Sequence, residues 1–459
     1  MKKEEIPMKK VLVLIAALVC LLALCMTASA ADVYEAKLCA TVTDAGQRVG
    51  DIVIDFGEAK KVTGVDAETF TVHASANVND ILAGTEMVSY GDYDLDRTIT
   101  GVDVEGQKVI IHMNLNEGAT LAYTSGARNY PATLTYTVTQ NKPITLTAAD
   151  GTVLDAAYTA EYTCDNTFTD EETAPFQSVL VEDGINYQFY DAGEGADTLI
   201  VWFHGNGEGD LLGSRNNVAQ MLANRGTVAW ATPEFQAAFG KAYVMSFQAP
   251  DTWYLAQKDG LLEKAYNEIQ AVIVDKGINP AKVLASGCSA GGYMTTRMII
   301  AYPTLFKAAI INCPAYDVAD ARGGETPTDD ELKAVKDSGV AIWLVQGDND
   351  TVVATDACSK RLFAILTEGA EVTETSIAQE LPQNSDFITS ETADGQYKLS
   401  LYKTTDEAQL RFAEDYDRDG VVEEVQHSSH WSWIYSLRNN PAAADGTHVI
   451  EWAAAILAK

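Results

Sequence analysis

Ser289 lies in a sequence pattern that is typical of an enzymatic nucleophile. Residues 287–291 read Gly-Cys-Ser-Ala-Gly, a G-x-S-x-G motif that follows the apolar run 283–285 and precedes a helix-like segment, 293–301. Between a strand and a helix, this motif places the serine on a sharp turn at the edge of a sheet. We interpret Ser289 as a candidate nucleophile and the amide of Ala290, at the helix start, as a candidate oxyanion donor. A glycine-rich turn without chemistry is the alternative.

A serine nucleophile needs a base to accept its proton and a carboxylate to orient that base. In a strand–helix architecture the chain order is serine, acid, histidine. Three histidines follow Ser289, namely His427, His430 and His448. We choose His430, which directly precedes an aromatic segment, with His427 as the second choice. His448 lies where the final helix is expected to begin, and we interpret it as structural.

The candidate acid follows the apolar run 341–345, which predicts a buried strand. Asp348 and Asp350 both come shortly after this run. Because the carboxyl ends of parallel strands meet at one edge of a sheet, an acid here would share that edge with Ser289. We prefer Asp350 to Asp348 because of its position relative to Gly347 and the valines that follow.

A second oxyanion donor is expected from the loop after an earlier strand. The apolar run 198–203 leads into His204-Gly-Asn-Gly-Glu-Gly209. We predict that the amide of Asn206 donates to the oxyanion and that His204 braces the loop. The glycine spacing does not fit a phosphate-binding loop, because no Lys-Ser/Thr pair follows and the spacing is not G-x-G-x-x-G.

Strand-like and helix-like segments alternate in residues 175–459. Buried strands are predicted at 198–203, 228–232, 283–285, 308–311 and 341–345, and helices at 261–276 and 293–301. This alternation predicts a mainly parallel sheet with helices on both faces. The looser, acidic stretch 366–426 is interpreted as an insertion that carries the last sheet strand and part of a substrate wall.

The preceding residues, 31–165, have a different pattern. Short β-rich runs at 36–42, 49–56, 69–74, 108–115 and 132–138 are separated by turns. Strands at this spacing predict an antiparallel, immunoglobulin-like sandwich. Residues 163–175 are polar and acidic and are interpreted as the linker between the two domains.

The amino terminus predicts export. Residues 1–30 contain lysines, then the apolar run 11–26, then Ala28-Ser-Ala30, as in a secretory signal peptide. We expect a secreted, soluble protein without stable membrane insertion; an uncleaved anchor is the alternative. The net charge of −33 argues against nucleic-acid binding and against strongly anionic substrates.

Metal and disulfide sites have weak support in the sequence. Five cysteines remain after the signal segment, without metal-binding spacing, and buried free thiols are favoured over a Cys288–Cys313 bond. The stretch from Asp415 to Asp419, followed by Gly420, matches the first half of a calcium loop, but Gln426 occupies the twelfth position, where glutamate is required. A hairpin turn at this place is the alternative.

Several motifs together resemble a known family of secreted α/β-hydrolase esterases. They are His-Gly-Asn-Gly-Glu at 204, Gln248-Ala-Pro before Trp253, Gly277-Ile-Asn-Pro-Ala-Lys-Val, Gly287-Cys-Ser-Ala-Gly-Gly-Tyr, Tyr302-Pro-x-x-Phe and Gly347-x-x-Asp350. The pattern is similar to feruloyl and acetyl-xylan esterases and polyhydroxybutyrate depolymerases. With the β-rich segment in front, it is most similar to esterases that carry an immunoglobulin-like domain. The resemblance implies a Ser289–Asp350–His430 triad. The sequence departs from the family pattern at Ala290, where relatives often have methionine.

The leading expectation is therefore an ester hydrolase without metal or organic cofactor, acting on small-molecule or polysaccharide-linked esters. Trp253 and Trp431 are candidates for lining an aryl- or sugar-binding pocket, with core packing as the alternative. A prolyl-oligopeptidase-type peptidase is disfavoured because about 140 β-rich residues are too few for a propeller of four or more blades. A non-catalytic surface-binding protein is the third possibility, and a complete Ser–Asp–His set argues against it.

Overall fold

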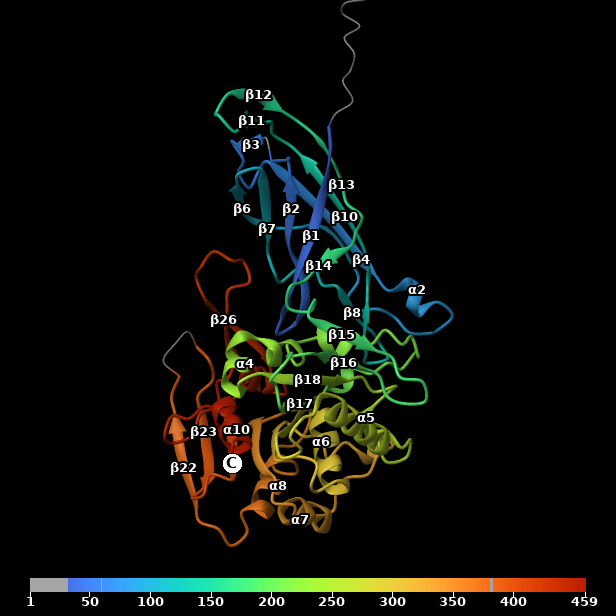
Figure 1. Ribbon diagram of the computed structural model, residues 1–459, viewed down its shortest axis with the longest axis vertical. Helices are drawn as coiled ribbons and strands as arrows, with labels where there is room; N and C mark the ends of the chain where they lie inside the picture. Colours follow the sequence, from blue (N-terminus) through green and yellow to red (C-terminus); the bar gives the residue numbers. More distant parts are fainter. Residues whose placement is uncertain (1–31, 59, 380–382) are drawn as a thin grey trace, which may run out of the picture.

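A computed structural model describes residues 32–58, 60–379 and 383–459. The molecule is elongated, with a narrow β-rich part above a wider α/β part (Figure 1). The predicted signal peptide, with Cys20 and Cys25, lies outside the described residues. Across the described ranges, no helix combines the length and apolar character needed to cross a membrane.

The amino-terminal part is an immunoglobulin-like sandwich. Its elements are β1 Val33–Thr43, β2 Gly46–Asp55, β3 Lys60–Thr63, β4 Phe70–Asn77, α2 Asn79–Leu82, β5 Tyr93–Asp96, β6 Ile99–Glu105, β7 Lys108–Met113, β8 Leu121–Tyr123, β9 Asn129–Pro131, β10 Thr133–Gln140, β11 Ile144–Ala148, β12 Val153–Tyr158, β13 Glu161–Thr163 and β14 Phe168–Thr169. All five predicted runs are strands. The largest sheet has the order β13-β1-β2-β7-β6, and alternate side chains of the strands form a separate core. The pairs β1–β2, β2–β7, β6–β7 and β4–β10 are antiparallel, as predicted, and β1 also pairs in parallel with β13 and β14.

The second part has an α/β-hydrolase fold. Its strands are β15 Phe176–Val179, β16 Tyr187–Tyr190, β17 Thr198–Phe203, β18 Ala242–Phe247, β19 Val283–Cys288, β20 Ala308–Asn312, β21 Ala341–Gly347, β22 Val372–Ile377, β23 Phe387–Thr392, β24 Tyr397–Tyr402, β25 Gln409–Glu414 and β26 Glu423–Ser428. Its helices are α3 Ala219–Leu222, α4 Pro233–Phe239, α5 Leu261–Lys276, α6 Ala290–Ala301, α7 Asp329–Asp337, α8 Ser359–Leu366, α9 Trp433–Leu437 and α10 Val449–Leu457. Four 3₁₀ turns join them: η1 Asn206–Glu208, η2 Val228–Ala231, η3 Trp253–Leu255 and η4 Asp320–Arg322.

Ten strands form one sheet in the order β15-β16-β18-β17-β19-β20-β21-β24-β23-β22. The six central strands, from β18 to β24, are parallel, and the strands at both edges are antiparallel. Helices α5, α6, α7 and α8 contact one another in series, whereas α4 and α10 pack together on the other side. Both α6 and α10 contact β19 and β20, so the central strands are covered on both faces (Figure 1).

One of the sequence predictions for this sheet was wrong, and another was confirmed. The run 228–232 is not a strand: its core is the buried 3₁₀ turn η2, and the strand next to β17 is β18, which the sequence analysis did not identify. Periodicity alone cannot distinguish a short buried strand from a buried helical turn. The insertion carries the last strand of the sheet in chain order, β24, as predicted, and also β23 and β22, which extend the sheet to its edge.

The two parts are in direct contact. Val42 and Leu121 of the sandwich share a small apolar cluster with three residues of the second part, Met221, Leu222 and Val228. The predicted linker, residues 163–175, packs against the sandwich. Its strand β14 pairs with β1, and the buried carboxylate of Asp170 accepts a hydrogen bond from Gln47 Nε2 at 2.5 Å. The sandwich is therefore held against the α/β part at several points.

Candidate active site

Ser289 lies in a strained turn between β19 and α6. Its backbone has φ 55° and ψ −116°, a region that residues other than glycine rarely adopt. Hydrogen bonds hold this conformation: the Ser289 amide donates to Asn312 O at 3.0 Å, and Ser289 O accepts from Ala315 N at 3.1 Å. A Cβ atom at Gly291 would lie 1.9 Å from Phe203 O. Glycine at 291 therefore allows the start of α6 to touch the end of β17.

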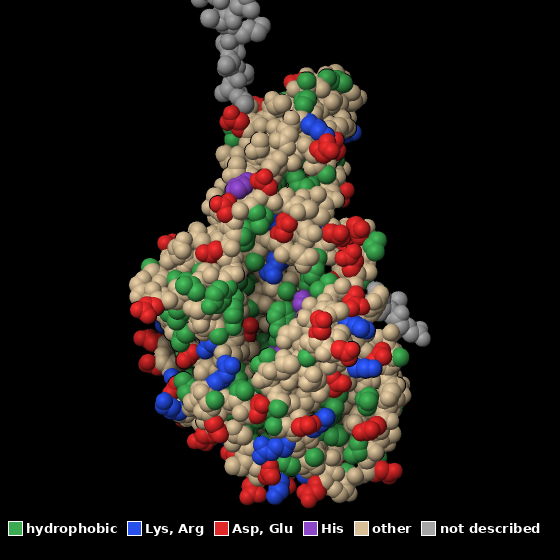
Figure 2. Space-filling model, turned by 180° about the vertical axis from the view of Figure 1, so that it is seen from behind, with side chains coloured by type: hydrophobic (Ala, Val, Ile, Leu, Met, Phe, Trp, Pro, Cys, Tyr) green, Lys and Arg blue, Asp and Glu red, His purple; other side chains and the backbone are tan. Residues whose placement is uncertain are grey.

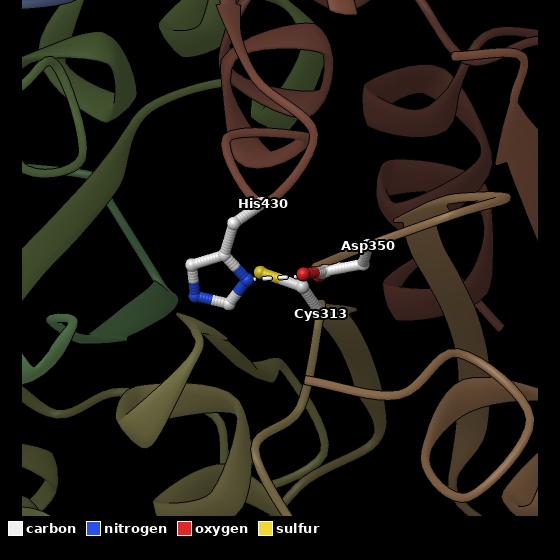
Figure 3. Close-up of side chains that lie close together, drawn as sticks. All are labelled: Cys313, Asp350 and His430. Atoms are coloured by element: carbon white, nitrogen blue, oxygen red, sulfur yellow. Dashed lines mark hydrogen bonds and ion pairs between the residues drawn. The ribbon is translucent and has the colours of Figure 1, made fainter. Parts of the chain in front are cut away.

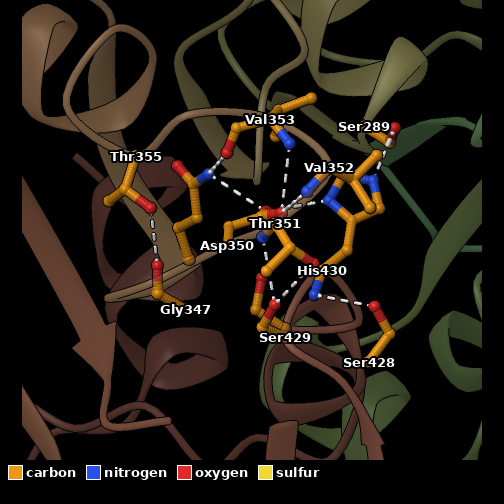
Figure 4. Close-up of polar contacts among 12 residues, drawn as sticks. Ser289, Gly347, Asp350, Thr351, Val352, Val353, Thr355, Ser428, Ser429 and His430 are labelled. Atoms are coloured by element: carbon orange, nitrogen blue, oxygen red, sulfur yellow. Dashed lines mark hydrogen bonds and ion pairs between the residues drawn. The ribbon is translucent and has the colours of Figure 1, made fainter. Parts of the chain in front are cut away.

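The side chains of Ser289, His430 and Asp350 form a continuous hydrogen-bonded chain (Figure 4). Ser289 Oγ lies 2.8 Å from His430 Nε2, and His430 Nδ1 lies 2.8 Å from Asp350 Oδ2. In neutral His430, a proton on Nδ1 donates to the carboxylate and leaves Nε2 free to accept the serine proton. The structure thus brings together the three residues selected from the sequence.

Asp350 is fixed in place by its own turn. The amides of Val352 and Val353 donate to Oδ1 at 2.9 and 3.1 Å (Figure 4). Gln346 Nε2 donates to Oδ2 at 3.1 Å. Burial alone would raise the pKa of Asp350, but the hydrogen bond and charge of His430, together with these amides, lower it. The carboxylate therefore stays ionised beside the imidazole.

The pKa of His430 is raised above its ordinary value. Burial by itself would lower it, but the Cys313 thiol and the Asp350 carboxylate outweigh this effect. Cys313 follows β20 and lies beside the contact between His430 and Asp350 (Figure 3). Thiol, carboxylate and imidazole are all metal-ligand types, but here the carboxylate and imidazole are hydrogen-bonded to each other.

This pKa shift predicts the acid limb of the pH–rate profile. His430 accepts a proton only when neutral, so kcat/KM should fall about tenfold per pH unit below its pKa. Because the shift is upward, the midpoint should lie above about 6.5, the ordinary value for histidine. Hydrolysis of a neutral ester measured from pH 5 to pH 10 tests this. A midpoint below pH 6, with the protein still folded, would contradict the interpretation.

The loop after β17 supplies the second candidate oxyanion donor. Ala290 begins α6 and Asn206 begins η1, and the first amides of a helix have no partner within that helix. His204 Nε2 accepts from Ala249 N at 2.9 Å, and its Nδ1 contacts Gly205 O. Burial lowers the pKa of His204 to about 3, so the ring is neutral and braces the loop.

A cavity of about 530 Å³ opens in front of Ser289 and His430. Figure 2 shows a hollow at the junction of the two parts, with hydrophobic side chains around it. Trp431 and Trp433 line the cavity, but Trp253 does not. Trp253 is fully buried and packs on Phe203 and His204, so the pocket role expected for it was wrong.

The sandwich forms much of the opposite wall of the cavity. Its contribution comes mainly from the β1–β2 turn at 44–46 and from residues 119–129, including Leu121, Tyr123 and Asn129. Among the described residues of the 366–426 insertion, which was expected to form part of this wall, none lines the cavity. Sequence reasoning did not identify these sandwich residues, because nothing in their spacing relates them to Ser289.

The alternative candidates lie elsewhere. His427 is in β26, with its ring stacked on Trp431 at 5.0 Å and near Phe412, and burial lowers its pKa. Asp348 is exposed and accepts hydrogen bonds from the amide and hydroxyl of Thr404 at 3.0 and 2.9 Å. His448 is exposed at the start of α10, as predicted.

The residues of the weakly supported calcium loop and disulfide can also be placed, and the favoured free thiols at Cys288 and Cys313 are observed. One carboxylate oxygen each of Asp415, Asp417 and Asp419 lies within 4.8 Å of the others. Gln426, at the twelfth position, directs its amide to Glu424 Oε1 at 2.8 Å. Cys288 and Cys313 are buried free thiols, and so is Cys358, whereas Cys39 and Cys164 are partly exposed free thiols.

Comparisons with known proteins agree with this architecture. The family model described as the esterase immunoglobulin-like N-terminal domain matches residues 35–155, and that of the prolyl oligopeptidase family matches residues 215–378, which include Ser289 and Asp350. No curated protein sequence matches the chain. A thermostable esterase of known structure has 21% identity and a TM-score of 0.63, covering 88% of this chain and 96% of its own.

Two further structures share smaller parts of the chain. An acetyl xylan esterase from Aspergillus awamori has 16% identity and a TM-score of 0.35, covering 50% of this chain and 93% of its own. A puromycin-hydrolysing peptidase from Mycobacterium tuberculosis has 17% identity and a TM-score of 0.35, covering 57% and 40%. Taken together, the family matches and the thermostable esterase show an immunoglobulin-like domain, of the kind found at the amino terminus of esterases, followed by an α/β-hydrolase fold.

Proposed function

We propose that the protein is a secreted carboxylic ester hydrolase that acts through an acyl-enzyme on Ser289. Ser289 Oγ attacks the ester carbonyl while His430 Nε2 accepts its proton, and Asp350 orients and stabilises the imidazolium. His430 then protonates the leaving alcohol, and a water activated by the same imidazole hydrolyses the acyl-enzyme. The amides of Asn206 and Ala290 stabilise the negative oxygen of each tetrahedral intermediate.

The observation that carries this proposal is the unbroken Ser289–His430–Asp350 hydrogen-bonded chain facing a cavity. Both hydrogen bonds measure 2.8 Å, and each of the three residues is less than one-tenth exposed. Such a chain removes the serine proton as the nucleophile attacks, which a lone serine cannot achieve. The strained backbone of Ser289 supports the same role, because strain is commonly retained where function requires it.

The cavity favours a compact acyl or aryl ester, either free or attached to a carbohydrate. Its volume of about 530 Å³ is within the range of small-molecule sites, roughly 300–1,000 Å³. Trp431 and Trp433 offer flat faces suited to an aromatic or sugar ring. The other wall is formed by the sandwich, so a long peptide has less room there than a small ester.

A substrate panel tests this proposal. The purified protein should hydrolyse p-nitrophenyl acetate and butyrate, together with at least one of an acetylated xylan fragment and a feruloylated sugar. Proline-containing peptides should give no product under the same conditions. Because the prolyl oligopeptidase family model matches residues 215–378, peptide hydrolysis is the specific alternative. Cleavage of peptides without cleavage of esters would contradict the ester-hydrolase proposal.

A further inference from the structure

The β8–β9 hairpin of the sandwich reaches the loop that carries Asn206. Arg128, in the turn of this hairpin, is only 5% exposed even though arginine is rarely buried without partners. Its guanidinium Nη2 donates to Asp251 Oδ1 at 2.6 Å, in the loop after β18. The buried side chain of Arg128, which belongs to the sandwich, is therefore paired with a carboxylate of the α/β part.

Besides a local hydrogen bond from Nη1 to Ala127 O at 3.0 Å, Arg128 contacts the side chain of Asn206. With the Asn206 amide oriented so that its nitrogen donates to Thr252 Oγ1 at 2.8 Å, its oxygen accepts from Arg128 Nη1, also at 2.8 Å. The same oxygen accepts from Arg322 Nη1 at 3.1 Å. The neighbouring Asn129 of the hairpin donates from Nδ2 to Gly207 O at 3.2 Å. The hairpin thus holds both the side chain of Asn206 and the backbone next to it.

This loop depends on such external contacts. Its only regular element is the three-residue turn η1, and glycines flank that turn at 205 and 209. Glycine has more backbone freedom than any other residue, so the turn does not fix its own orientation. A Cβ atom at Gly209 would lie 1.7 Å from Asp251 O and 3.2 Å from Arg128 Nε. The close approach of these three segments shows how tightly the loop is enclosed.

We propose that Arg128 is a positioning residue for the oxyanion hole: by bridging Asn206 and Asp251, it aims the Asn206 amide at the reacting carbonyl oxygen. The immunoglobulin-like domain then contributes a residue that the active site needs, and it is more than a spacer or an anchor for the catalytic domain. This inference rests on the proposed ester hydrolysis at Ser289. An oxyanion donor must be placed accurately, because a displacement of about 1 Å can cost about 100-fold in rate.

The test compares Arg128→Gln and Arg128→Lys with a matched variant, Arg225→Gln. Arg225 also joins the two domains, with Nη1 donating to Val42 O at 2.7 Å and Nη2 lying 2.7 Å from Glu172 Oε1, but its recorded partners lie outside the oxyanion loop. Lysine keeps the charge of Arg128 but lacks the planar fork needed for two fixed partners. Both Arg128 variants should lower kcat for p-nitrophenyl acetate by about 10–100-fold with KM changed less than about threefold.

Two further readouts separate positioning from a general loss of structure. In Arg128→Gln, the rate of Ser289 labelling by a fluorophosphonate should fall by about the same factor as kcat. The attack of Ser289 on the phosphorus places negative charge on an oxygen, as its attack on an ester carbonyl does. In a double-mutant cycle, Arg128→Gln and Asn206→Ala should be strongly non-additive, because both changes break the same contact. Arg225→Gln should keep kcat within about threefold, and its melting temperature should match that of Arg128→Gln.

The outcomes distinguish this inference from the proposed function. If the wild-type protein is labelled at Ser289 and Arg128→Gln has unchanged kcat and labelling rate, the positioning role is wrong and the ester-hydrolase proposal stands. Equal losses in Arg128→Gln and Arg225→Gln, with equal drops in melting temperature, would also overturn it, since domain docking alone would explain them. A wild-type protein that is neither labelled nor active on any ester would overturn the proposed function and, with it, this inference.

Discussion

Replacing Ser289 with alanine is expected to lower kcat for p-nitrophenyl acetate by about 10⁵-fold, equal to about 7 kcal/mol of transition-state stabilisation. The substitution removes the hydroxyl oxygen that lies 2.8 Å from His430 Nε2 and acts as the nucleophile. The cavity and the oxyanion amides stay in place, so KM for residual hydrolysis should change little. Steady-state kinetics at pH 8, with background hydrolysis subtracted, provide the measurement.

A matched control exists in the strand directly before the motif. Ser286 lies on β19, three residues before Ser289, and is fully buried, with its hydroxyl lacking a hydrogen-bond partner among the described residues. Ser286→Ala should therefore keep kcat within about threefold. If Ser289→Ala retains more than about one-tenth of the wild-type activity while Ser286→Ala abolishes it, the assignment of the nucleophile is wrong.

Replacing His430 with alanine should lower kcat by at least about 10⁴-fold, because the serine then loses its proton acceptor. His427→Ala should instead keep kcat within about fivefold. The ring of His427 stacks on Trp431, a residue of the cavity wall, and has no hydrogen bond to Ser289. Its loss should affect KM and thermal stability more than kcat. The comparison uses the same ester, with circular dichroism to check that both variants fold.

His427 and His430 are three residues apart in the chain, so comparing their alanine variants identifies which of the two is the base. If His427→Ala abolishes turnover and His430→Ala remains active, the base is misassigned and the hydrogen bond at 2.8 Å has no catalytic role. If both variants lose activity with intact folds, His427 is also required for catalysis, through its stacked contact with Trp431, and the expectation for His427→Ala is wrong.

Local sequence patterns were sufficient to predict the centre of the site. A G-x-S-x-G motif fixes a strand, a turn and a helix within about ten residues, so Ser289 and Ala290 could be placed from sequence alone. Asp350 could be chosen because residues after parallel strands meet at one edge of the sheet. His430 was chosen from the three histidines that follow Ser289, because the histidine comes last in this architecture. The structure brings these residues together as that reasoning expected.

Features that depend on long-range packing could not be predicted. Trp253 looked like a pocket residue because aromatic side chains suit both pockets and cores, and only the packing against Phe203 shows that it is in the core. The run 228–232 is apolar enough for a strand, yet the place next to β17 is taken by β18. Arg128 precedes Ser289 by more than 150 residues, and only domain docking brings it to the oxyanion loop.

The contribution of the sandwich to the cavity changes how the amino-terminal part is understood. The sequence predicted only an immunoglobulin-like sandwich for this part. In the structure, Tyr123 and Asn129 line the same cavity as Ser289, and Arg128 contacts the loop that carries Asn206. Substitutions in the β8–β9 hairpin should therefore change substrate preference without touching the α/β-hydrolase fold.

The most direct test of the account is to identify the residue that becomes covalently modified during turnover. The protein is treated with a fluorophosphonate, its intact mass is measured, and the modified peptide is mapped by tandem mass spectrometry. We predict one adduct per chain on Ser289, formed at a rate that drops sharply in His430→Ala and not in His427→Ala. An unmodified protein, or an adduct on another residue such as Ser286 or Ser429, would contradict the central claim.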